Sequence, residues 1–276
     1  MTLKELYSYC SHALEFSGNG DFEALCIFED ILNVSKSQIY IDCSEVSQEK
    51  ISLVEEAIKR RKDGEPLQYI LGTWDFYDLT FKVGKGVLIP RPETEALVDF
   101  ALEKLKNVKN PVVYDLCAGT GCIGLTVAKH RPDATVFLLE KESEALKYLN
   151  MNNEMLSLTN TKIIQGDLFN VDVSLFYDAD MLLSNPPYII SDEISQLQKE
   201  VQLEPITALD GGEDGLDFYR CLASRWSKKV KDGGWIAMEC GEEQSKPIID
   251  IFSGIYSENN VIFDFNNIDR IVTFRI

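Results

Sequence analysis

Histidine is scarce in this chain of 276 residues, and its cysteines show no paired spacing. The two histidines, His12 and His130, lie far apart, and no two cysteines form a Cys-x-x-Cys pair. Structural zinc sites need four nitrogen or sulfur ligands close together, so we expect no metal site. The odd number of cysteines suits a reducing compartment. The seven are Cys10, Cys26, Cys43, Cys117, Cys122, Cys221 and Cys240.

Basic surface is also lacking. The chain has 27 Lys and Arg against 45 Asp and Glu residues, a formal net charge of −18. Such a balance repels a phosphate backbone, so we expect no direct nucleic-acid partner. The single dense basic cluster is residues 59–62. We interpret it as the solvated last turn of a helix, where cations favour the negative end of the dipole.

No apolar run is long enough to cross a bilayer, and no basic-then-apolar leader follows Met1. We therefore expect a cytoplasmic protein without membrane contact. We also expect a monomer.

Residues 1–70 are predicted to form a helical domain. Thr2 with Glu5 has the form of a capping box, and Ser47 is a candidate N-cap for a helix that ends before Gly64. This domain is either a packing module or a platform that recognises a macromolecular substrate. Apolar residues recur at helical spacing as Leu3, Leu6, Tyr7, Cys10 and Leu14, then Phe22, Leu25, Phe28 and Leu32, then Ile51, Val54 and Ile58.

Residues 71–90 are predicted to be a β-hairpin linker, because apolar residues approach alternation there. The proline-rich stretch 88–95 then leads into a helix near Glu93. Residues 91–276 form the third predicted part of the chain.

Strands and helices alternate after Pro111, which predicts an α/β fold. We expect a doubly wound, seven-stranded, mostly parallel sheet with helices on both faces. The expected strands are 112–116, 134–139, 162–165, 180–184, 235–239, 261–263 and 270–276, and the expected helices are 122–130, 142–156 and 215–226.

The loop after the first strand of this sheet indicates a cofactor. Ligands of doubly wound sheets lie over the carboxyl ends of the strands. Gly119 and Gly121 let the backbone approach a ligand, and Glu140 ends the next strand, where it can accept hydrogen bonds from both ribose hydroxyls. An adenosine-containing cofactor is expected. Residues 119–124 also fit the G-x-G-x-x-G dinucleotide pattern, which leaves a nicotinamide-dependent oxidoreductase open.

A second motif, Asn185-Pro186-Pro187-Tyr188, closes the apolar run 181–183. Each proline fixes its own φ, and Pro186 holds Asn185 extended. The Asn185 carboxamide and the Pro186 carbonyl are thus acceptors aimed in advance at a substrate NH₂ group. A hydride-transfer site has no use for this corner. Together with Asp115 and its glycine loop, the corner resembles the class I S-adenosylmethionine-dependent methyltransferases.

The motifs at 88–95, 115–121, 166–167, 185–189 and 204–209 are similar to those of the glutamine N5-methyltransferases that modify peptide chain release factors. The resemblance implies S-adenosylmethionine as cofactor and the glutamine of the release factor's Gly-Gly-Gln motif as substrate. It places the cofactor against Cys117, Ala118, Gly119, Thr120, Gly121, Glu140, Leu168 and Asn185. It places the substrate against Asn185, Pro186, Pro187 and Tyr188, of which Asn185, Pro186 and Tyr188 would be catalytic. The family usually has Asp at position 140 and often an aromatic residue at 168, and both departures could weaken cofactor binding.

The implied chemistry must overcome the poor nucleophilicity of an amide nitrogen. Asn185 and Pro186 can accept both amide N–H bonds, orient the nitrogen and stabilise its developing positive charge. Tyr188 either packs flat on the amide plane or fills the pocket. One alternative is an N6-adenine methyltransferase acting on DNA or RNA, which the acidic charge disfavours. Another is a non-catalytic adaptor, which would not need these motifs together.

Overall fold

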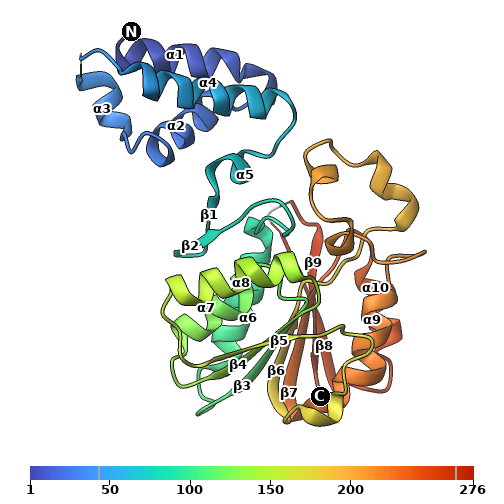
Figure 1. Cartoon of the computed structure of the whole chain (residues 1–276). Helices are drawn as coiled ribbons and strands as arrows, with labels where there is room; N and C mark the ends of the chain where they lie inside the picture. Colours follow the sequence, from blue (N-terminus) through green and yellow to red (C-terminus); the bar gives the residue numbers. More distant parts are fainter. Residues whose placement is uncertain (43, 265) are drawn as a thin grey trace. The chain divides into compact units, whose positions relative to one another are not determined.

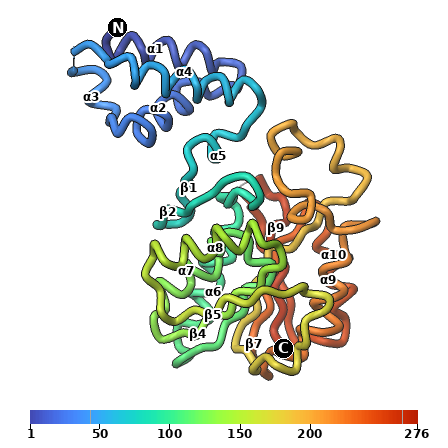
Figure 2. The backbone as a smooth tube through the Cα atoms, in the orientation of Figure 1, coloured from blue at the N-terminus to red at the C-terminus, as the bar shows by residue number. Residues whose placement is uncertain are grey.

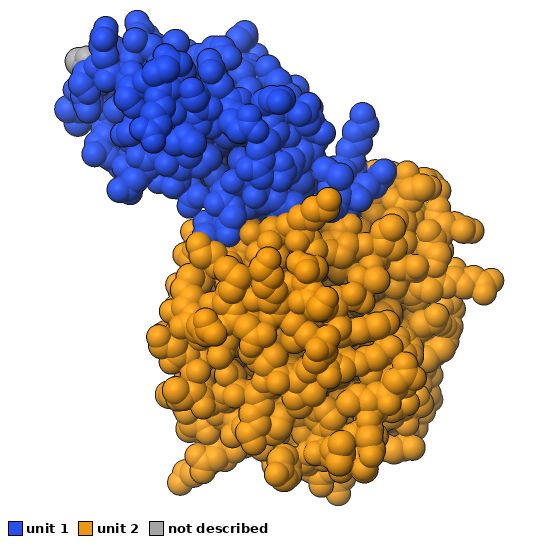
Figure 3. Space-filling view, viewed as in Figure 1, with its two compact units in different colours: residues 1–73, 198–203 blue, residues 74–197, 204–276 orange. Residues whose placement is uncertain are grey.

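The computed structural model describes residues 1–42, 44–264 and 266–276 (Figure 1), so Cys43 lies outside the described residues. The described residues form two compact units (Figure 3). One consists of residues 1–73 together with 198–203, and the other of residues 74–197 and 204–276. None of the helices in the described ranges has the length and apolar run that a membrane crossing needs.

The first unit is built from short helices. Thr2 caps the first of them as a capping box, since the Glu5 amide donates to Thr2 Oγ1 and the Thr2 amide to Glu5 Oε2. Ser47 caps the fourth through the Lys50 amide. Both predicted caps are confirmed, whereas α3 and α5 were not predicted because they are too short to show a helical period. The helices are α1 (Leu3–Ala13), α2 (Gly20–Asp30), α3 (Lys36–Ile41), α4 (Gln48–Lys62) and α5 (Leu67–Leu71).

One residue of the basic cluster 59–62 is not solvated. Arg61 is 4% exposed, donates to both Glu23 carboxylate oxygens at 2.9 and 3.0 Å, and donates to Glu200 Oε1 at 2.7 Å. The prediction of a solvated helix end was therefore wrong for Arg61. Glu200 belongs to the segment 198–203, so the ion pairs join that segment to the helices of its unit.

The predicted hairpin is present as β1 (Thr73–Phe76) and β2 (Leu79–Lys82). The proline-rich stretch ends in a turn of 3₁₀ helix, Pro92–Thr94, which runs into α6 (Glu95–Leu105).

The second unit contains the predicted seven-stranded sheet (Figure 2), and its strand order is β5-β4-β3-β6-β7-β9-β8. Strands β3 to β7 pair in parallel, and β9 runs antiparallel to both of its neighbours. The strands are β3 (Val112–Leu116), β4 (Thr135–Glu140), β5 (Thr161–Gln165), β6 (Ala179–Ser184), β7 (Val230–Glu239), β8 (Glu258–Phe263) and β9 (Asp269–Arg275).

Helices cover both faces of the sheet because alternate strand residues are apolar on each side. Val113 packs into a core with α6, α7 (Cys122–His130) and α8 (Ser143–Met155), whereas its neighbour Tyr114 faces the opposite core. That core contains α9 (Asp217–Cys221), the π-helical turn Leu222–Trp226 that continues it, and α10 (Ser245–Ile251). Helix α10 was not predicted.

The parallel register aligns the carboxyl ends of four strands. Leu116 pairs with Leu139 on one side and with Ser184 on the other, and Ser184 pairs with Met238. The residues that follow these pairs therefore meet at one edge of the sheet, where a ligand site is expected. They are Cys117, Glu140, Asn185 and Glu239.

Candidate active site

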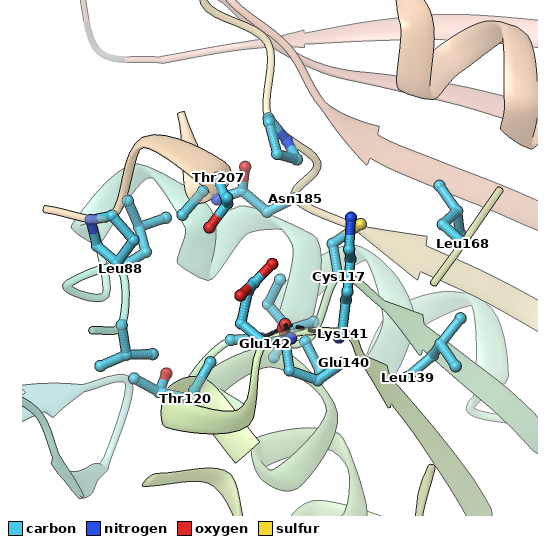
Figure 4. Close-up of a pocket in the computed structure, with 18 of the residues that line it drawn as sticks. Leu88, Cys117, Thr120, Leu139, Glu140, Lys141, Glu142, Leu168, Asn185 and Thr207 are labelled. Atoms are coloured by element: carbon cyan, nitrogen blue, oxygen red, sulfur yellow. Dashed lines mark hydrogen bonds between the residues drawn. The ribbon is translucent and has the colours of Figure 1, made fainter. Parts of the chain in front are cut away.

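A hollow with about 1000 Å³ of empty space, counted to its open mouth, lies over these strand ends (Figure 4). Its place over the carboxyl ends of parallel strands is where doubly wound sheets bind ligands. In the described residues no group of three or more His, Cys, Asp or Glu side chains could hold a metal ion. The hollow is lined by residues 86–91, Thr94, Cys117, Ala118, Gly119, Thr120, Cys122, Ile123, residues 139–142, Ala145, residues 166–169, Asn185, Pro187, Pro205, Thr207, Ala208 and Phe218.

The glycine loop forms the floor of the hollow between β3 and α7. A Cβ atom on Gly119 would meet only Val87 Cγ2, at 3.9 Å, so the absent side chain leaves open space for a ligand. Gly121 is required for a different reason: its φ is +80°, and a Cβ atom there would lie 2.3 Å from Leu149 Cδ1. Of the predicted loop residues, Gly121 alone does not line the hollow. Cys117 has φ +65°, a strained conformation for a side chain, next to the site.

Asp115 lies behind the loop and is fully buried. Its Oδ2 accepts from the Gly124 amide at 2.8 Å, whereas Oδ1 has no partner among the described residues. Burial, with the nearby Glu140 charge and against the Gly124 hydrogen bond, raises the pKa of Asp115 to about 7. A buried acceptor without a partner is unusual and is expected where a ligand or ordered water completes the site.

Glu140 ties the glycine loop to the end of β4. Its Oε2 accepts from the Gly119 amide, and its Oε1 accepts from the amides of Lys141 and Glu142, each at 2.8 Å. Burial raises the pKa of Glu140, and these three N–H groups oppose that rise. A carboxylate has about four acceptor positions, so one remains for a ligand hydroxyl. The Glu142 carboxylate, which the sequence did not single out, lies beside Glu140 in the hollow (Figure 4).

Leucine and polar side chains line different parts of the hollow. Leu139 and Leu168 lie at one end, and Asn185 and Thr207 lie toward the other (Figure 4). Leu168 is 4% exposed and presents an apolar face. Such an arrangement suits a ligand with a flat apolar group at one end and a reacting group at the other.

The corner at Asn185 is held by hydrogen bonds of the segment that follows it. The Ile189 amide donates to the Leu209 carbonyl at 2.9 Å, and Gln244 Nε2 donates to the Tyr188 carbonyl at 2.9 Å. Pro187 lines the hollow, whereas Pro186 and Tyr188 do not. Tyr188 packs against the core around α9 and α10, and burial raises the pKa of its hydroxyl.

Three polar residues at the site were not assigned a role from the sequence. Asn185 Nδ2 donates to Thr94 Oγ1 at 3.3 Å, and Thr94 Oγ1 donates to Glu239 Oε2 at 2.5 Å. Glu204, 4% exposed, accepts from the Ile89 amide at 3.0 Å and from the Arg91 guanidinium. The position of Glu239 at the carboxyl end of a parallel strand was the signal that could have marked it.

Comparisons with known proteins identify the family of this chain. Residues 5–72 match the family model of the PrmC N-terminal domain, and residues 94–203 match that of the methyltransferase small domain. The chain is 39% identical over 255 residues to a release factor glutamine methyltransferase of Thermodesulfovibrio yellowstonii, covering 91% of this chain and 90% of the relative. The chain belongs to the release factor glutamine methyltransferase family.

A second member of this family, from Clostridium acetobutylicum, is 38% identical and covers 83% of this chain and 81% of the relative. Among solved structures, the 16S rRNA N2 G1207 methyltransferase RsmC of Thermus thermophilus, in complex with AdoMet and guanosine, has a TM-score of 0.52. It is 17% identical, covers 74% of this chain and 49% of its own, and shows the shared methyltransferase fold.

Proposed function

We propose that this protein transfers a methyl group from S-adenosylmethionine to the side-chain amide nitrogen of the glutamine in the Gly-Gly-Gln motif of peptide chain release factors. Family membership supports the substrate. The observation that carries the chemistry is Asn185, a carboxamide in the hollow whose nitrogen is already bound by Thr94. Its oxygen is thus left for a substrate N–H₂ group.

The donor set fits S-adenosylmethionine. The space beside Gly119 admits a ligand close to the backbone, Glu140 retains one acceptor position for a ribose hydroxyl, and Leu168 offers an apolar face to adenine. Cys117, Ala118, Thr120 and Asn185 line the same hollow and complete the proposed cofactor contacts. Gly121 would contribute through the shape of the loop, since it does not line the hollow.

When bound, S-adenosylmethionine supplies a methyl group whose bond to sulfur breaks, with its electron pair going to sulfur, as the glutamine nitrogen forms the new bond with its lone pair. Asn185 Oδ1 and the Pro186 carbonyl accept the two amide N–H bonds and orient the nitrogen. These acceptors stabilise the positive charge that develops on nitrogen. The extra proton leaves to solvent afterwards, so no strong base is required.

The Pro186 carbonyl suits this role because no hydrogen bond within the described part of the chain occupies it. Pro187 would form the wall beside the substrate, and Tyr188 would hold the corner from behind. We further propose that residues 1–70 recognise the release factor, that residues 71–90 are the linker, and that residues 91–276 hold the reaction site. A monomeric, cytoplasmic enzyme remains our expectation.

The decisive experiment incubates the purified protein and S-adenosylmethionine with unmodified release factor and, separately, with DNA and RNA. Peptide mass spectrometry then locates any added methyl group. We expect a gain of one methyl on the glutamine of the Gly-Gly-Gln motif, and loss of this product in Asn185→Ala. Methylated adenine with unmodified release factor would instead establish the N6-adenine alternative.

A further inference from the structure

The orientation of the Asn185 carboxamide decides whether the site can bind a substrate amide. This inference rests on the proposed function, in which the Asn185 oxygen must face the substrate N–H₂ group. The oxygen and nitrogen ends of a carboxamide have nearly the same size, and one accepts where the other donates. A neighbour of fixed hydrogen-bonding polarity must therefore select the end that faces the hollow.

Thr94 is such a neighbour, and it is connected to Glu239 by a second hydrogen bond. Asn185 Nδ2 lies 3.3 Å from Thr94 Oγ1, which lies 2.5 Å from Glu239 Oε2. Thr94 is 1% exposed and Glu239 is 3% exposed, so solvent has little access to replace either bond. Asn185 directly follows β6, Thr94 ends the turn before α6, and Glu239 is the last residue of β7; the Ser184–Met238 pair aligns the residues that precede Asn185 and Glu239.

The donor and acceptor roles in these two hydrogen bonds follow from the chemistry of the Glu239 carboxylate. An ionised carboxylate only accepts, so the single hydroxyl proton of Thr94 must point at Glu239. Thr94 Oγ1 can then only accept from Asn185, which selects the NH₂ end. We propose that Glu239 and Thr94 are positioning residues whose hydrogen bonds turn the Asn185 oxygen toward the substrate amide.

Protonation of Glu239 would release this constraint. Its proton could be donated to Thr94, whose hydroxyl would become free to donate to the Asn185 oxygen and turn the NH₂ end into the hollow. Burial, against the Thr94 hydrogen bond and the charge of Arg270, raises the pKa of Glu239 to about 7. The titratable and charged groups that act electrostatically with Glu239 are Arg91, Glu93, Cys122, Tyr188, Tyr219, Cys240 and Arg270.

The test compares Glu239→Gln, Thr94→Val and Thr94→Ser in the full chain, with unmodified release factor as substrate. Glutamine keeps the shape of Glu239 but can donate to Thr94 as well as accept from it, so the direction of the two hydrogen bonds is no longer fixed. Valine keeps the shape of threonine and removes the hydroxyl. We expect both variants to lower kcat by about 10²-fold, since a small misplacement of a reacting group has that effect. Thr94→Ser keeps the hydroxyl group and should therefore retain most of the wild-type kcat.

A matched control separates positioning from packing. Thr273 on β9 is also fully buried and donates to the Asn260 carbonyl, away from the hollow. Thr273→Val is expected to keep wild-type kcat. Calorimetric titration with S-adenosylhomocysteine should show a loss of affinity much smaller than the loss of kcat in Glu239→Gln and Thr94→Val, because Asn185 is only one of several proposed cofactor contacts.

The pH profile is the readout that a merely structural role would not move. Wild-type kcat should rise through a group with a pKa near 7, and Glu239→Gln should lose this rise. If Glu239→Gln or Thr94→Val keeps the kcat and pH profile of the wild type, the positioning role of Glu239 and Thr94 is overturned, while the proposed function stays intact. Loss of cofactor affinity in parallel with kcat would also overturn the positioning role, because the residues would then support the pocket as a whole. Absence of glutamine methylation by the wild type would refute both proposals.

Discussion

Replacement of Glu239 by glutamine is expected to stabilise the second unit progressively as the pH rises, relative to the wild type. Burial raises the pKa of Glu239 from its ordinary 4.5 to about 7. A carboxyl group with a raised folded-state pKa contributes stability that is complete below pH 4.5 and is lost as the pH rises through 7. At 1.36 kcal/mol for each unit of pKa, the loss is about 3 kcal/mol.

The glutamine variant has no proton to lose at this position. Its free energy of unfolding, relative to wild type, should therefore increase by up to about 3 kcal/mol between pH 5 and pH 8. Placing an amide beside Thr94 changes the same free energy by an amount that does not depend on pH. The rise with pH is thus the diagnostic part of the measurement, and the constant offset is not.

Urea unfolding at pH 5, 6, 7 and 8, followed by tryptophan fluorescence, measures this difference. All three tryptophans, Trp74, Trp226 and Trp235, lie in the second unit, so the signal reports on the unit that holds Glu239. Thr273→Val serves as the control, because its difference from wild type should be the same at every pH. A pH-independent difference for Glu239→Gln would refute the reasoning, since Glu239 would then ionise as it does in water.

The remaining predictions concern the site and the first unit. Asn185→Ala should slow single-turnover methyl transfer by about 10² to 10³-fold, as loss of one charge-stabilising group does, and near-normal turnover would contradict the mechanism. Glu140→Ala should weaken S-adenosylhomocysteine binding measured by calorimetry, and unchanged affinity would count against the assigned site. Glu23→Gln should destabilise the chain by about 3 kcal/mol, because it removes the charge of the buried partner of Arg61. Glu200→Gln should cost less than about 1 kcal/mol, because the Glu200 side chain is partly exposed. Equal effects of the two substitutions in thermal unfolding would contradict this prediction. Removal of residues 1–70 should spare cofactor binding and impair methylation of intact release factor, which equal activity would disprove.

The sheet, the glycine loop and the corner at Asn185 were predictable because their signals are local. A short apolar strand followed by glycine, or by two prolines, identifies a strand end within a few residues. Once parallel order is inferred, strand ends such as Glu140 and Asn185 are known to share one edge of the sheet. This logic identified the loop residues 117–120, Glu140 and Asn185, all of which line the hollow.

The polar contacts behind the corner were not predictable in the same way. Thr94 and Glu239 are 145 positions apart, and Ile89 and Glu204 are 115 apart, so their hydrogen bonds depend on tertiary packing. Arg61 was misplaced for the same reason. A basic helix end is normally solvated, and only the fold brings a carboxylate from the segment 198–203 against it.

Glu239 links stability and the proposed reaction in opposite directions. As the pH rises through 7, its ionisation removes up to about 3 kcal/mol of folding stability, and the same ionisation gives Thr94 the polarity that orients Asn185. A glutamine would fill the same space without that cost, but it could donate to Thr94 as well as accept from it, so it would not fix the polarity of Thr94. Opposite pH slopes for wild-type stability and kcat, both lost in Glu239→Gln, would therefore identify one carboxyl group as the origin of both effects. A structural role alone predicts the stability slope without the kinetic one.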